Sequence, residues 1–239
     1  MSIGDAEIKT QERVIRFFKD PEILGYQYIG NLSDYQNKNI KEDRLRQYLR
    51  LKGYADKLID AAIMQLQQEA GNLSRGVYDA NKTVYSRLKY GIPVSESPEK
   101  PPVTVQLVDE EKPLNNDFAI AEEVTVVEQS EKRPDLVVYL NGIAVAVIEL
   151  KRSSISVSEG IRQNLTNQKN SFIQSFFTTM QFCMAGNESE GLRYGTLLTG
   201  EKFYMEWKDD GFKEHEEERD PVDVRISKTC EGIENKLLK

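Results

Sequence analysis

The fold is decided by the stretch Arg133-Pro-Asp-Leu-Val-Val-Tyr-Leu-Asn-Gly-Ile-Ala-Val-Ala-Val-Ile-Glu-Leu-Lys151. Two almost wholly apolar runs, 136–140 and 143–150, flank the pair Asn141-Gly142, which is typical of a tight turn in a β-hairpin. Residues 143–148 are apolar at every position, so they predict a central strand that is covered on both faces. The sequence therefore predicts a sheet with helices packed against it.

Charged residues flank these two strands. Asp135 precedes the first strand, while Glu149 and Lys151 end the second on one face, because strand side chains alternate. Two carboxylates and a lysine suit phosphodiester hydrolysis: the carboxylate oxygens can hold a hard cation such as Mg²⁺, and the ammonium can offset charge on the phosphate. From spacing alone, ordinary solvated strand ends are the alternative.

The register of the hairpin decides whether the acids meet. A two-residue loop at Asn141-Gly142 would pair Asp135 with Ile148 and leave Asp135 and Glu149 on opposite faces. A three-residue loop, with Gly142 left-handed in a bulge, would make the two acids diagonal neighbours on one face. A shared cation therefore predicts the bulged hairpin.

The rest of the chain divides into a helical part and a strand-rich part. Helices are expected at residues 6–19, 42–51, 55–70, 77–90 and 157–169, and strands at 24–29, 103–108, 118–127, 136–140, 143–150, 179–185, 194–199 and 202–207. The proline-rich segment 93–102 predicts a surface connection. We expect one α/β domain over residues 1–239, with a mainly helical part at 1–91, the sheet core at 103–207 and a C-terminal segment at 208–239.

The composition excludes several classes of protein. The 239 residues include 39 acidic and 32 basic side chains, for a formal net charge of -7, so any DNA contact is expected to be local or shared with partners. A single histidine, His215, excludes zinc-protease and paired-histidine chemistry, and two cysteines exclude a disulfide framework. With neither a membrane-spanning stretch nor a signal peptide in the sequence, we expect a cytoplasmic protein.

Several motifs resemble those of a known nuclease family. Pro134-Asp135 followed by Glu149-Leu150-Lys151 is similar to the PD-(D/E)XK motif, and the wider sequence resembles the N-terminal nuclease domain of the R (restriction and motor) subunit of type I restriction enzymes. The resemblance is carried in order by Val105-Gln-Leu-Val-Asp109, Asn115-Asn-Asp-Phe118, Arg133-Pro-Asp135, Asn141-Gly142, Val147-Ile-Glu-Leu-Lys151, Ala185-Gly-Asn187 and Tyr194-Gly-Thr196. It implies a restriction-endonuclease-like mixed β-sheet flanked by helices, and a type I site-specific deoxyribonuclease that uses Mg²⁺, with Mn²⁺ as a substitute.

The resemblance also implies roles for individual residues. It makes Asp135 and Glu149 the metal ligands and Lys151 the catalytic lysine. The family has a further glutamate on the first helix, for which Glu12 fits best as a metal ligand and Glu7 is the alternative.

A second family motif, Gln-x-x-x-Tyr, is expected on the helix after the active-site strand. Gln163 occupies the place of the catalytic glutamine, on a helix that begins with an apparent capping box at residues 156–159. Asn167 stands where the tyrosine is expected. Gln163 points away from the buried stripe of this helix, so a simply exposed side chain is the alternative, and Gln168, nearer the stripe, could substitute for Gln163.

DNA and protein partners are also implied. Arg152, Arg162 and Lys169 could contact DNA phosphates, with a charged helix face as the alternative. The family's R subunit carries an ATP-driven motor, but residues 195–200 have only the glycine spacing of a P-loop, and Glu201 stands in place of its lysine, which predicts a strand and turn. The chain thus resembles the nuclease portion alone, with ATP acting only through a motor region that is missing here.

The implied partners of the domain are DNA and the modification and specificity subunits of a type I complex. Two other functions stay open at this point. The domain could be a non-catalytic docking module of that complex, or a stand-alone nuclease selective for DNA structure.

Overall fold

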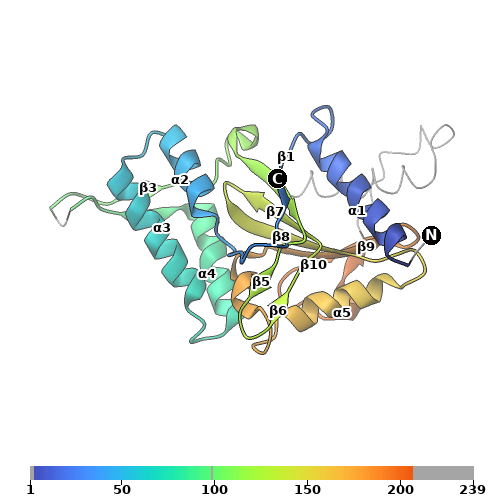
Figure 1. Cartoon of the computed structure of the whole chain (residues 1–239). Helices are drawn as coiled ribbons and strands as arrows, with labels where there is room; N and C mark the ends of the chain where they lie inside the picture. The colour runs from blue at the N-terminus through green and yellow to red at the C-terminus, as the bar shows by residue number, and fades with distance from the viewer. Residues whose placement is uncertain (1–2, 98, 207–239) are drawn as a thin grey trace.

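The computed structural model describes residues 3–97 and 99–206, with side chains from Ile8 onward. Its centre is a seven-stranded mixed sheet of order β1-β4-β7-β8-β9-β10-β11 (Figure 1). The strands are β1 (Gln27–Asn31), β4 (Phe118–Glu122), β7 (Leu136–Leu140), β8 (Ile143–Leu150), β9 (Phe182–Asn187), β10 (Gly191–Gly195) and β11 (Met205–Glu206). Two small sheets pair β2 (Ile92–Val94) with β3 (Val103–Val105) and β5 (Val126–Val127) with β6 (Glu131–Lys132). This mixed architecture confirms the predicted α/β class.

The helices are concentrated in the N-terminal half, as predicted. They are α1 (Ile3–Lys19), α2 (Glu42–Leu51), α3 (Asp56–Gly71), α4 (Val77–Tyr90) and α5 (Val157–Asn167), with short 3₁₀ turns η1 (Pro113–Asn115), η2 (Gln174–Thr179) and η3 (Glu201–Phe203). None of the helices in the described part of the chain is long and apolar enough to cross a membrane. The expected segment 208–239 and His215 lie outside the described residues.

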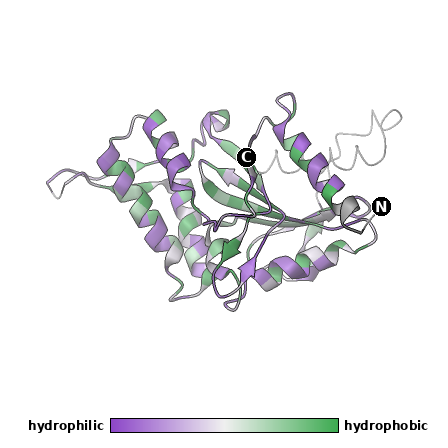
Figure 2. Ribbon diagram, viewed as in Figure 1, coloured by the Kyte–Doolittle hydropathy of each residue, from purple (hydrophilic) through white to green (hydrophobic). Residues whose placement is uncertain are grey.

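Helices cover both faces of the central sheet. Helix α1 packs through Val14 and Phe18 in the same core cluster as Leu150 of β8, and α2 and α3 contribute to that cluster. On the other face, Val147 packs with Phe177 of η2, and α5 lies against β8 and β9. Figure 1 shows α1 and α5 on opposite sides of the sheet, and Figure 2 shows the hydrophobic strands between helices with hydrophilic outer faces. All eight residues of β8 are buried, which confirms the predicted central strand.

A bulge in β8 sets the register of the β7–β8 hairpin. Leu140 pairs with Ile143 around the turn, whereas Leu136 pairs with Ile148 at the far end, so β8 has one residue more than β7 between these pairs. Val145 is the extra residue, because Val145 and Ala146 lie in the same core cluster instead of on alternate faces of the strand. After the bulge, every side chain of β8 has changed faces relative to an unbroken strand.

The predicted three-residue loop is wrong, although its consequence for the acids holds. The turn has two residues, Asn141 and Gly142, both left-handed with φ of 52° and 83°, and the bulge lies inside the strand. The register brings Asp135 directly opposite Glu149, where the prediction made them diagonal neighbours. Both schemes place the two carboxylates on one face of the sheet.

The observed bounds of the helices and strands show where the sequence pattern was sufficient to place them. The ranges 42–51, 77–90, 136–140 and 143–150 are confirmed to the residue. The expected strand 118–127 is interrupted at Glu123, whose φ is 51° and whose N–H donates to the carbonyl of Asp135. Within the expected strand 202–207, residues 202–203 end η3 and residues 205–206 form the short strand β11, while residue 207 lies outside the described residues. Residues 195–200 form the end of β10 and a turn, as predicted. The proline-rich segment 93–102 lies within the β2–β3 hairpin.

We predict that Asn141→Ala destabilises the domain by about 2–4 kcal/mol. The side chain is fully buried, accepts from the N–H of Asp117 at 2.7 Å and donates to the carbonyl of Leu107 at 2.8 Å. Alanine would leave these groups unpaired and is strained in the left-handed conformation. Thermal melting should show a loss of several degrees, whereas the exposed Asn72→Ala serves as a control with little effect. Equal melting of both variants would contradict the assigned role of the turn.

Candidate functional site

The three motif residues lie together at the edge of the sheet where β8 ends. Asp135 immediately precedes β7, Glu149 is the penultimate residue of β8, and Lys151 directly follows β8. The N–H of Leu150 donates to Oδ2 of Asp135 at 2.6 Å, which orients that carboxylate toward the end of β8. Leu150 itself points into the core on the α1 side, as its alternation predicted.

Helix α5 covers the Glu149 side chain, which is fully buried. Gln163 of α5 donates from Nε2 to Oε2 of Glu149 at 2.6 Å. The helix can approach this closely because residue 160 is glycine: a Cβ there would lie 2.9 Å from Cβ of Ala185 and 3.5 Å from Cβ of Glu149. The other carboxylate oxygen, Oε1, is buried and has no hydrogen-bond partner among the described residues.

Burial and a neighbouring carboxylate both change the pKa of Glu149. Burial raises the pKa of the Glu149 carboxyl well above its usual value, and repulsion from the Asp135 carboxylate raises it further. The Lys151 ammonium lowers the pKa, while the closeness of the Asp135 carboxyl and the charge of Glu123 add smaller upward contributions. A positive charge placed between Asp135 and Glu149 would relieve this repulsion.

Lys151 is half-buried beside these acids. Its backbone N–H donates to the carbonyl of Gly186 at 2.9 Å, so the main chain is still held by β9 at this point. Its ammonium donates to the carbonyl of Leu150 at 2.9 Å. The lysine is therefore anchored at the sheet edge with its charge close enough to influence Glu149.

The start of α5 is held by the turn between β9 and β10. Glu190 accepts the N–H of Val157 at 3.0 Å, and Ser156 accepts the N–H of Ser158 at 3.3 Å. The expected capping box is only half formed, because Glu159 does not return to Ser156 but pairs with Arg162 at 2.8 Å. These caps fix the helix that carries Gln163.

The other residues of the expected glutamine-tyrosine motif do not reach Glu149. Asn167, in the place of the tyrosine, is buried with 2% of its surface exposed, and its Nδ2 has no partner among the described residues. Gln168 is also buried, but it accepts from the N–H of Leu198 at 2.7 Å and contacts Sγ of Cys183 at 3.5 Å. Gln168 is thus bonded within the core beneath α5 and does not take the place of Gln163 at Glu149.

On α1, Gln11 contacts the two acids at the end of β4. It is buried and donates from Nε2 to Glu122 at 3.0 Å and to Glu123 at 3.3 Å. Glu12 is exposed and lines a hollow beside Tyr28 and Glu122. The role of Glu12 as a metal ligand stays a prediction, and the side chain of the alternative, Glu7, lies outside the described residues.

The basic residues near the site differ in how they are engaged. Arg162 is exposed, and its guanidinium is held by Glu201 through two bonds of 2.8 and 2.9 Å in addition to Glu159. Arg152 is half-buried just after Lys151, and Lys169 is exposed beyond the end of α5. Arg162 therefore fits the alternative of a charged helix face. A phosphate contact by Arg152 or Lys169 stays a prediction.

A divalent cation fits the chemistry of this donor set. Among the described residues, no group of three or more histidine, cysteine, aspartate or glutamate side chains is arranged to hold a metal ion. Asp135 and Glu149 nevertheless face each other across the hairpin, and the buried Oε1 of Glu149 lacks a donor. These are oxygen ligands of the kind that Mg²⁺ takes together with water.

Sequence reasoning missed three contributors to the site. Glu123 adds negative charge beside Glu149 and pairs with Arg133 at 3.0 Å, Gln11 connects α1 to this acidic edge, and Gly160 permits the approach of α5. The pair Glu122-Glu123 at the end of an apolar strand was the available signal for an acidic edge. Gly160 inside a helix was the signal for close packing.

The mixed sheet flanked by helices, with an acid pair and a lysine at its edge, is consistent with the class of nuclease-like folds. The family of the type I restriction enzyme R protein N terminus matches residues 7–203, and the chain belongs to this family. No curated protein matches the sequence significantly. Family membership supports a nuclease role in restriction, and it associates the chain with a multi-subunit restriction complex that acts on DNA.

We predict that Glu149→Gln raises the melting temperature of the metal-free domain at pH 8. The neutral amide can accept from Gln163 and donate to Asp135, and it removes a buried charge; the gain should be about 1 kcal/mol or more. Because the folded-state pKa of Glu149 is raised, the destabilisation of the wild type appears as the pH rises above the unfolded pKa. The gain should therefore be larger at pH 8 than at pH 5.

The measurement is thermal melting in the presence of a chelator. The matched control is Glu111→Gln, which removes an exposed carboxylate and should change the melting temperature little. A lower melting temperature for Glu149→Gln at pH 8 would contradict this prediction, because it would mean that the ionised carboxylate stabilises the fold.

Proposed function

We propose that this domain hydrolyses DNA phosphodiester bonds with Mg²⁺ as part of a type I restriction complex. The observation that carries the proposal is the buried carboxylate of Glu149, which faces Asp135, is held on one oxygen by Gln163 and has its other oxygen without a donor. Lys151 stands beside the pair. Family membership supports the same reaction class.

Asp135 and Glu149 would hold the cation. The hydrogen bond from Leu150 fixes one oxygen of Asp135. The hydrogen bond from Gln163 fixes one oxygen of Glu149, and the buried Oε1 of Glu149 has no donor among the described residues. When bound, the ion would polarise a phosphate and lower the pKa of a coordinated water. The positions of both ligands are set by the backbone of the hairpin, which reduces the reorganisation needed on binding.

Lys151 supplies a positive charge where the phosphate would react. Its ammonium is close enough to lower the pKa of Glu149, and it lies at the open edge of the sheet rather than within the core. In this position it can orient the attacking water and offset the charge that develops on the phosphate. Gln163 positions Glu149 and excludes water from its buried side.

The wider assembly would supply what this domain lacks. We propose that DNA is presented by an ATP-driven motor region, and that the modification and specificity subunits of the complex select the DNA. A net charge of -7 gives the chain little hold on DNA by bulk electrostatics. Cleavage by the chain alone is therefore expected to be slow.

We predict that about 5 mM Mg²⁺ or Mn²⁺ raises the melting temperature of the wild-type domain, because an ion that binds only the folded state stabilises it by mass action. Asp135→Asn should reduce this shift strongly, since it removes one of the two charged ligands. The exposed Asp34→Asn serves as the matched control and should keep the full shift. Equal shifts in all three proteins would contradict a metal site at Asp135.

We predict that Lys151→Ala lowers the rate of DNA cleavage by about a hundredfold or more, because one preorganised charge acts in the transition state. Metal affinity should be almost unchanged, whereas Glu149→Ala should lose metal affinity and cleavage together. Cleavage should be measured in the assembled complex, with translocation monitored in parallel. Lys112→Ala, an exposed lysine, is the control. Wild-type cleavage by a translocating Lys151→Ala enzyme would favour the docking module instead.

A further inference from the structure

The exposed face of α4 carries tyrosines and lysines in alternation. Tyr78, Lys82, Tyr85 and Lys89 are spaced four, three and four residues apart, so they form one stripe along the helix. Tyr78 is 59% exposed and Tyr85 is 49% exposed. The buried residues of α4 lie on a different side of the helix, so packing of the core does not account for these rings. We call these four residues the α4 stripe.

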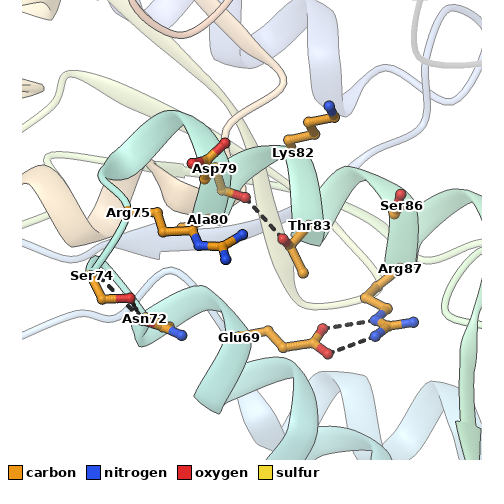
Figure 3. A pocket seen from close by; sticks show the side chains of 10 residues that line it. All are labelled: Glu69, Asn72, Ser74, Arg75, Asp79, Ala80, Lys82, Thr83, Ser86 and Arg87. Atoms are coloured by element: carbon orange, nitrogen blue, oxygen red, sulfur yellow. Dashed lines mark hydrogen bonds and ion pairs between the residues drawn. The ribbon is translucent and has the colours of Figure 1, made fainter.

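A hollow adjoins the α4 stripe where α3 ends and α4 begins (Figure 3). It has a volume of about 690 Å³, and Lys82 lines it as well as belonging to the stripe. Figure 3 shows Arg75 directed into the hollow, above the carboxylate of Glu69. The Glu69 carboxylate is already paired with Arg87, which donates two hydrogen bonds of 2.7 and 2.8 Å to it.

The charge of this region is opposite to that of the whole chain. Residues 72–91 contain four basic side chains and one acidic side chain, Asp79, in a chain whose formal net charge is -7. Among the described residues, no carboxylate lies within ion-pair distance of Arg75, Lys82 or Lys89, and Nζ of Lys89 lies 5.6 Å from the ring centroid of Tyr90. Their charges are therefore available to a ligand, although Asp79 lines the same hollow and opposes an anion there.

We propose that the α4 stripe and the adjoining hollow bind single-stranded DNA. Lysines are depleted at protein–protein interfaces, whereas surfaces that bind single strands combine cations for the phosphates with aromatic rings for the bases. Tyr78 and Tyr85 are two helical turns apart, about 10 Å, which corresponds to about three steps of stacked bases. Duplex DNA offers no unpaired base to these rings, so the surface should prefer the single strand.

The experiment is binding of a fluorescent single-stranded oligothymidylate, about 15 nucleotides long, to the full chain. Fluorescence anisotropy is measured in low salt with a chelator, so neither metal binding nor cleavage affects the result. The combined variant Tyr78→Ala/Tyr85→Ala should weaken binding at least about fivefold. The variant Lys82→Ala/Lys89→Ala should reduce the slope of log K against log salt by about 1.4.

The matched control is Tyr35→Ala/Lys38→Ala, which removes an exposed tyrosine and an exposed lysine from a different segment and should bind as the wild type does. Asp135→Asn should also keep binding, so a failure of the proposed nuclease function and a failure of this surface are distinguishable. The proposal is overturned if the wild type does not bind, if the stripe variants bind normally, or if a duplex of equal length binds as tightly as the single strand. Thermal melting confirms that each variant is folded.

Discussion

The burial of the Glu149 carboxylate opposite Asp135 is the constraint on which the rest of the structure depends. A charge at the end of a wholly apolar strand is costly unless hydrogen bonds or an ion compensate for it. The bulge at Val145 turns Glu149 toward Asp135, and Gly160 lets α5 approach closely enough for Gln163 to reach it. Each of these features is local, and together they keep two like charges on one face of the sheet.

The turn between β9 and β10 connects this site to both layers of the fold. Glu190 accepts from the first N–H of α5, while Glu188 accepts from Thr10 at 3.1 Å and from Arg13 at 3.3 Å on α1. One short turn therefore fixes helices that lie on opposite faces of the sheet. The acidic edge lies between these helices, so its geometry depends on three segments that are far apart in the sequence.

The sequence was sufficient to predict the central strands and the closeness of Asp135 and Glu149, but not the strand register that brings these two acids opposite each other. In the run 143–148 every residue is apolar, so no alternation marks which side chain changes faces, and the bulge at Val145 leaves no trace in the pattern. Likewise, the sequence favoured Glu12 on the first helix, whereas its neighbour Gln11 is the buried side chain that reaches Glu122 and Glu123. Contacts between distant segments decide such cases.

The distribution of charge is compatible with the proposed action of an acidic domain on a polyanion. Glu122, Glu123, Asp135 and Glu149 gather at one edge of the sheet, where a cation would compensate for them and where DNA without a cation would be repelled. The basic side chains of α4 lie elsewhere, on a helix packed against η2 before the start of β9. Under the two proposals, attraction and chemistry would be separated in space: a strand held at α4 or by a motor would approach the acidic edge more easily once the ion has offset part of the local negative charge. If the proposed nuclease function holds, this arrangement would tie contact between DNA and the acidic edge to the presence of the ion.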